Sequence, residues 1–99
     1  MVYEFEAVLW LWDARRDSWT FVSLPTETAD RIDDIAGPFT RGFGSVRVEA
    51  TVGTTVWRTS IFPDSKRGTY VLPVKRAVRS AEHLQAGDTV QVGLRLVDL

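Results

Sequence analysis

A β-hairpin centred on Gly53 and Thr54 is the feature that most constrains the fold of this chain. Before the turn, small apolar residues alternate with polar ones over residues 46–52, which is the period-2 pattern of a strand with one buried face. Glycine at the first central position is typical of a two-residue type II′ turn, because that residue must adopt a positive φ. The turn sets the register, since a slip by one residue would turn the valines toward water. The predicted pairs are Val52–Thr55, Ala50–Trp57, Val48–Thr59 and Val46–Ile61 on one face, and Glu49–Arg58 and Thr51–Val56 on the other.

The rest of the sequence favours further short strands with two helical segments between them. Alternating patterns predict strands over residues 2–12, 19–24, 69–72 and 88–97. Apolar residues at helical spacing predict helices near Thr26–Ala36, with Thr26 as the N-cap, and near Val74–Leu84. We therefore expect a mainly β fold, a small and mostly antiparallel barrel, closed or partly open, of six to seven strands with two short helices.

Composition limits the kinds of site that the chain could carry. The sequence shows no linker or internal repeat, so we expect residues 1–99 to form a single β-barrel domain. Because there is no Cys and only one His, a thiolate or zinc site is disfavoured, and we expect no metal and no cofactor. No signal-like or membrane-spanning segment is recognisable, and we therefore expect a cytoplasmic protein with no membrane partner.

Aromatic side chains gather in the first two predicted strands. Symmetric pairing of these strands places Trp12 opposite Trp19 and Trp10 opposite Phe21, all on one face. In the first strand this face changes from polar to apolar halfway along, so its far end should be covered by a helix, by barrel curvature or by a partner. The ordinary interpretation is that the four rings belong to the core or to its rim. The alternative is an aromatic platform for a flat ligand, a base or a peptide side chain.

Charge is unevenly distributed, although the formal net charge is only −1. Residues 1–34 carry eight acidic and three basic residues, whereas residues 35–99 carry five acidic and nine basic residues. The acidic residues of the first helix and the basic residues of the second could be complementary surfaces, either between copies of this chain in a homo-oligomer or toward a partner. The candidate anion-binding residues are Lys66, Lys75, Arg76 and Arg79.

Four segments resemble a known family. They read G-F-G-S-V-R-V, W-R-T-S-I-F-P, Y-V-L-P-V-K-R-A-V-R and A-G-D-T-V-Q-V. These segments are similar to the family catalogued as domain of unknown function 1905, and the resemblance covers roughly residues 3–97. It implies a small, largely antiparallel β-barrel, which some members fuse to a domain of the YdeI/OmpD-associated kind that is not expected here. It implies no established activity and leaves three sets of motif positions to test, Thr59–Ser60, Phe62–Pro63 and Pro73–Val74–Lys75.

Three classes of function are compatible with the sequence. A small ligand or a protein could bind at the barrel mouth, with Trp10, Trp12, Trp57 and Arg58 as candidate contacts. Nucleic acid could instead bind the basic helix face, although the acidic first half gives no net attraction to a polyanion. The third class is an enzyme, but no nucleophile–base pair and no phosphate-loop spacing is recognisable, so no catalytic residue is assigned. A non-catalytic binding module is the class that the sequence favours.

Overall fold

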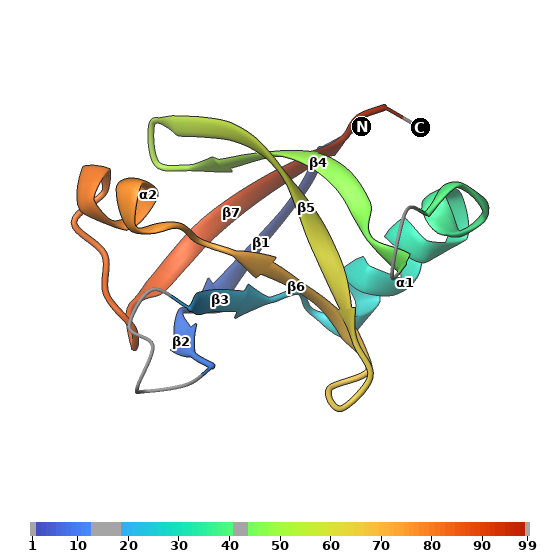
Figure 1. Cartoon of the computed structure of the whole chain (residues 1–99), viewed down its shortest axis with the longest axis horizontal. Helices are drawn as coiled ribbons and strands as arrows, with labels where there is room; N and C mark the ends of the chain where they lie inside the picture. Colours follow the sequence, from blue (N-terminus) through green and yellow to red (C-terminus); the bar gives the residue numbers. More distant parts are fainter. Residues whose placement is uncertain (1, 13–18, 41–43, 99) are drawn as a thin grey trace.

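The computed structural model describes residues 2–12, 19–40 and 44–98, which form a mainly β fold (Figure 1). Its strands are β1 (Val2–Val8), β2 (Trp10–Leu11), β3 (Thr20–Ser23), β4 (Val46–Val52), β5 (Thr55–Asp64), β6 (Thr69–Pro73) and β7 (Thr89–Leu96). Its helices are α1 (Thr26–Ala36), the short 3₁₀ helix η1 (Gly37–Phe39) and α2 (Arg76–Ala81). The predicted fold class is confirmed. Within the described ranges, no helix has the length and apolar character needed to cross a membrane.

The strands form one antiparallel sheet that curls into a half-barrel, in the order β1-β7-β4-β5-β6-β3-β2 (Figure 1). The prediction of one strand over residues 2–12 is wrong at Leu9. There the chain stops pairing with β7 and begins to pair with β3, so that consecutive strands lie at the two ends of the sheet. The Leu9 N–H donates to the Asp88 carbonyl at 2.9 Å, and the Leu9 carbonyl accepts from the Gly87 N–H at 2.8 Å. The Leu9 side chain is fully buried, so this bend is part of the core.

The central hairpin has the predicted register. Every predicted pair between β4 and β5 is present, from Val46–Ile61 to Val52–Thr55. Gly53 has a φ of 60°, whereas the φ of Thr54 is not positive. This combination is expected for a type II′ turn. Local turn chemistry and the alternation of side chains therefore specify the same structure.

Glu82, at the C-terminal end of α2, ties that helix to the hairpin turn. Its Oε2 accepts a hydrogen bond from Thr55 Oγ1 at 2.6 Å and a longer one from Thr54 Oγ1 at 3.3 Å. The Thr55 hydroxyl is the main reason that the pKa of Glu82 lies below its ordinary value. The turn is thus held from outside the sheet as well as by its own hydrogen bonds.

The core lies inside the curl of the sheet, and α1 covers it at one end (Figure 1). The inward-facing strand residues include Val22, Val46, Val48, Ala50, Ile61, Leu72, Val92 and Leu94. Ala29, Ile32 and Ala36 of α1 are buried with them. The Tyr70 hydroxyl of β6 donates to Asp33 Oδ1 of α1 at 3.1 Å. Burial, aided by this carboxylate, raises the pKa of Tyr70 to about 12.

The start of α1 differs from the prediction in one residue. Pro25 rather than Thr26 is the N-cap, and no side chain caps the helix. Pro25 has an extended conformation, with φ −56° and ψ 143°, and its carbonyl accepts the Ala29 N–H at 3.0 Å. Proline fixes φ near the value that this position needs, so Thr26 is already inside the first turn.

The second helix is shorter than predicted, because α2 spans Arg76–Ala81 and not Val74–Leu84. The Val74 N–H donates to the Thr20 carbonyl at 2.9 Å, so this residue continues the pairing of β6 with β3. At the other end, His83 has a φ of 56°, which a helix cannot continue through. Both limits depend on contacts that helical periodicity does not reveal.

Candidate ligand-binding face

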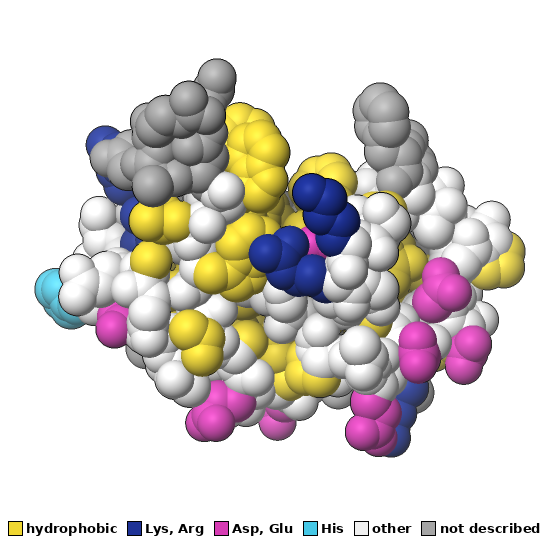
Figure 2. Space-filling view, turned by 90° about the horizontal axis from the view of Figure 1, so that it is seen from below, with side chains coloured by type: hydrophobic (Ala, Val, Ile, Leu, Met, Phe, Trp, Pro, Cys, Tyr) yellow, Lys and Arg dark blue, Asp and Glu magenta, His cyan; other side chains and the backbone are white. Residues whose placement is uncertain are grey.

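The outer face of β2, β3 and β6, together with the end of β5 at Phe62, is mainly apolar. Because side chains alternate across a strand, burying Val22 and Leu72 turns Phe21 of β3 and Val71 and Pro73 of β6 outward. Cross-strand pairing makes neighbours of Trp10 and Phe21, of Phe21 and Pro73, and of Val71 and Phe62. We call this surface the aromatic face, and it consists of Trp10, Trp12, Trp19, Phe21, Phe62, Val71 and Pro73. Figure 2 shows hydrophobic side chains gathered in the middle of this side, with Lys and Arg beside them.

Four of these rings form two pairs, as the sequence predicted. The ring centroids of Trp10 and Phe21 are 5.2 Å apart, and so are those of Trp12 and Trp19. Trp10 is also held by its Nε1, which donates to Ser23 Oγ at 3.0 Å. Trp12 is 58% exposed and Trp19 is 45% exposed, so these two rings do not belong to the core, whereas Trp10 and Phe21 are half-buried, as at the rim of a core. Side-chain alternation turns Trp10 and Trp12 away from the face that buries Leu9.

Two adjoining hollows lie on the aromatic face. The apolar hollow, of about 380 Å³, is lined by Trp19, Phe21, Phe62, Val71, Pro73 and their neighbours, and Lys75 is the charged residue in this lining. The cationic hollow, of about 350 Å³, has two cations, Lys66 and Arg67, and one acid, Asp64, in its lining. The other residues that line it are Trp10, Trp12, Trp19, Phe21, Pro63, Ser65 and Val71. Trp19, Phe21 and Val71 line both hollows and therefore lie at the boundary between them, which we call the ridge.

Arg67 is fixed over the Trp10 ring in the cationic hollow. Its guanidinium carbon lies 4.0 Å from the ring centroid, a cation–π contact. Its Nη1 donates to Asp64 Oδ2 at 2.7 Å, and Asp64 Oδ1 accepts the Lys66 backbone N–H at 3.1 Å. The hydrogen bond from Arg67 is the main cause that lowers the pKa of Asp64. The turn between β5 and β6 thus holds a positioned cation against an aromatic ring.

A third hollow, of about 250 Å³, continues from Asp64 toward α1 and is acidic. Asp30, Asp33 and Asp64 line it together with Tyr70. An anionic ligand on the aromatic face would therefore be repelled at the α1 end and attracted at the end where Lys75 lies.

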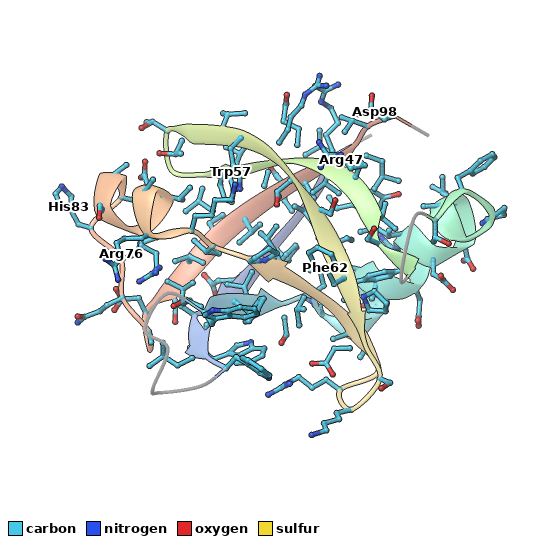
Figure 3. All side chains as sticks on the ribbon, in the orientation of Figure 1. Arg47, Trp57, Phe62, Arg76, His83 and Asp98 are labelled. Atoms are coloured by element: carbon cyan, nitrogen blue, oxygen red, sulfur yellow. The ribbon has the colours of Figure 1, made fainter. Side chains whose placement is uncertain are left out.

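Two of the four predicted ligand contacts lie elsewhere. Trp57 packs against the core, and its indole Nε1 is buried without a hydrogen-bond partner among the described residues. It lies five residues before Phe62 on β5, about 17 Å along the strand and on the opposite face (Figure 3). Arg58 is exposed and lies opposite Glu49 in the register of the hairpin. Trp10 and Trp12, in contrast, share one hollow.

The predicted anion-binding residues divide between two places. Lys66 and Lys75 border the aromatic face, one in each hollow. Arg76 and Arg79 line a separate hollow of about 350 Å³ beside α2, together with His83 (Figure 3). The Arg79 Nε donates to the Val74 carbonyl at 3.1 Å, which holds this guanidinium close to the start of α2.

Sequence reasoning missed several contributors to the aromatic face. Trp19 and Phe21 were placed in the cluster by the predicted strand pairing but were not proposed as contacts. Phe62 stands in a segment shared with the resembled family, which was the only signal for it. Arg67 lies in a turn, where no periodicity indicates the direction of a side chain.

The family model of a domain of unknown function, DUF1905, matches residues 5–94. The chain belongs to this family. The match bears on the DUF1905 domain alone and not on proteins of the YdeI kind. A comparison with curated proteins finds no match. Over the described part of this DUF1905 domain, no group of three or more His, Cys, Asp or Glu residues is placed to hold a metal ion.

Proposed function

We propose that this DUF1905 domain is a non-catalytic binding module that holds a flat, anionic ligand on its aromatic face. One observation carries the proposal. The exposed indole rings of Trp12 and Trp19 lie beside two adjoining hollows. In one of these hollows, the guanidinium of Arg67 is positioned over the ring of Trp10.

The chemistry of the lining supports binding of such a ligand. Exposed Trp rings in a cluster mark interaction sites more often than isolated apolar residues do, because leaving them in water is unfavourable. A flat ring can stack on Trp12 or Trp19, and an anionic group can reach Lys66 or Lys75. Asp30 and Asp33 line the neighbouring hollow on the α1 side. The ligand's negative charge should therefore lie over β2, β3 and β6.

The same lining does not favour catalysis. Asp64 accepts hydrogen bonds from Arg67, and its lowered pKa makes it a poor general base. His83 is the only histidine in the sequence, and it borders the hollow beside α2 and not the aromatic face. A binding role needs neither residue as a proton carrier.

Calorimetric titration with 2-naphthoate, a flat ring that bears one carboxylate, tests the proposal. We expect binding, and we expect the Trp12→Ala variant to weaken it by between about fivefold and about 150-fold, since stacking on an aromatic side chain contributes about 1–3 kcal/mol. The control variant is Val56→Ala, which removes another exposed apolar side chain from β5. Absence of binding by 2-naphthoate, or equal binding of the cationic analogue 2-naphthylmethylammonium, would contradict the proposed function.

We also propose that the protein acts in the cytoplasm, where the absence of Cys has no structural cost. Fractionation of cells that express the tagged chain would test this, and recovery outside the cytoplasmic fraction would contradict it.

A further inference from the structure

We propose that the ligand of the aromatic face is single-stranded nucleic acid, whose neighbouring bases enter the two hollows while its phosphates contact the flanking cations. This inference rests on the proposed function and specifies the ligand class. It is carried by the division of the face into two hollows and by the placement of charge around them.

The ridge between the hollows indicates a ligand with more than one flat group. Each hollow, at about 350–380 Å³, is at the small end of the range for a small-molecule site, about 300–1,000 Å³. A ligand that fills both must cross the ridge of Trp19, Phe21 and Val71. Consecutive bases joined by a flexible backbone can do so, because each base can stack on a different ring and the sugar–phosphate link passes over the ridge.

The charges outline a path for the backbone. Lys66 and Arg67 lie at the cationic hollow and Lys75 at the apolar hollow, so both ends of the aromatic face carry a cation. Arg76 and Arg79 follow Lys75 on α2 and extend the cations beyond the face. The acidic hollow adjoins the cationic hollow at Asp64 and continues toward α1, on the side where Figure 2 shows several of the acidic side chains. The strand should therefore run toward α2 and away from α1.

The exposed rings select single strands over duplexes. Stacking on Trp12 or Trp19 needs the open face of a base, and in a duplex these faces are covered by neighbouring base pairs. An anionic membrane surface offers charge to the cations but no separate flat rings to stack on Trp12 and Trp19. The net charge of −1 is not an obstacle, because the attraction comes from cations within a Debye length of the face, about 10 Å at 0.1 M salt.

Fluorescence anisotropy with end-labelled, mixed-sequence 12-nucleotide strands, at about 50 mM salt and upward, tests the inference. We expect the single strand to bind and the matching duplex to bind at least tenfold more weakly. The slope of log K against log salt should lie between about −2 and −3.5, the values for three to five phosphate contacts on a single strand.

Variants distinguish the contribution of ring stacking to binding from the contribution of charge. Trp12→Ala should lower the affinity for the single strand without changing the salt slope, because it removes a ring and no charge. Lys66→Ala combined with Lys75→Ala should reduce the magnitude of the slope by about 1.4. Arg31→Ala removes one positive charge from α1, where Arg31 pairs with Glu27, and should change neither quantity. Phe62→Ala provides a second ring variant in the apolar hollow if Trp12→Ala does not fold.

Titration of 2-naphthoate in parallel makes the possible failures distinguishable. If 2-naphthoate binds and the single strand does not at about 50 mM salt, the nucleic-acid inference is overturned while the proposed function stands. Equal binding of duplex and single strand, or binding of phosphatidylserine vesicles without binding of oligonucleotides, also overturns the inference. If neither 2-naphthoate nor the single strand binds, the proposed function fails as well.

Discussion

Gly53 combines two constraints at the scale of a single residue. It has a φ of 60°, which L-residues rarely adopt, and a Cβ at this position would overlap the Glu82 carboxylate. Gly68 is a matched control, since its φ is 66° but nothing lies within 4 Å of an added Cβ. We expect Gly68→Val to destabilise the fold by about 1–2 kcal/mol, the cost of the left-handed conformation, and Gly53→Val to destabilise it by more. Urea unfolding measures both. If both variants lost the same free energy of unfolding, Glu82 would not restrict the turn. If Gly53→Val were as stable as the wild-type protein, the turn would not be type II′.

Tyr70 is the residue that should make stability fall in alkaline solution. Its pKa is raised from 10.0 to about 12 by burial and by Asp33, so the folded state holds the phenolic proton more tightly than the unfolded chain does. The resulting stabilisation is complete below pH 10 and is lost as the pH rises toward 12. We therefore expect the difference in unfolding free energy between the wild-type protein and Tyr70→Phe to shrink from pH 9 to pH 11.5. A difference that stays constant over this range would mean that the pKa of Tyr70 is not raised.

At the scale of elements, the bend between β1 and β2 brings a buried side chain close to an exposed one. Leu9 lies at the bend and is 1% exposed, whereas Trp12 is 58% exposed just beyond it. We expect Leu9→Ala to destabilise the protein by about 2–5 kcal/mol, as for other buried leucines. Trp12→Ala should cost less than about 1.5 kcal/mol, the contribution of its contact with Trp19. Thermal or urea unfolding of the two variants would settle the comparison. A Trp12→Ala loss as large as that of Leu9→Ala would place the ring in the core.

The elements that could be predicted from the sequence are those whose specification is local. The turn at Gly53 and the alternation on either side of it agree, so the register of β4 and β5 follows from a short segment. The bend at Leu9 could not be predicted, because Leu9 fits the alternation and the change of partner from β7 to β3 depends on distant strands. The limits of α2 likewise depend on the pairing of Val74 with Thr20.

The candidate site, too, could be predicted from the sequence only where local pattern specifies it. Alternation and pairing correctly predicted that Trp10, Trp12, Trp19 and Phe21 share a face. They could not predict whether that face is covered, because coverage depends on which other elements pack there. Residues in turns, such as Arg67, have no periodicity that indicates their direction.

At the scale of the whole molecule, the two helices lie at opposite ends of the half-barrel and carry opposite charge (Figure 1). Glu27, Asp30 and Asp33 belong to α1, and Arg76 and Arg79 belong to α2. We expect copies of the chain to associate weakly end to end at low salt, because these surfaces are complementary. Exposed ion pairs contribute only about 0–1 kcal/mol each, so the association should disappear at high salt.

Light scattering at low and high salt measures this association. A monomer at both salt concentrations would exclude it. A dimer that is indifferent to salt would indicate instead that two copies meet through their aromatic faces.

The central claim, that the aromatic face is the binding site, is tested most directly by the indole signals in a ¹H–¹⁵N spectrum. Four Trp residues give four such signals, and Trp57 serves as an internal control because its Nε1 is buried on the opposite side of β5. On titration with 2-naphthoate, we expect the signals of Trp10, Trp12 and Trp19 to shift and that of Trp57 to stay in place. A shift confined to Trp57, or no shift of any indole at saturating ligand, would contradict it.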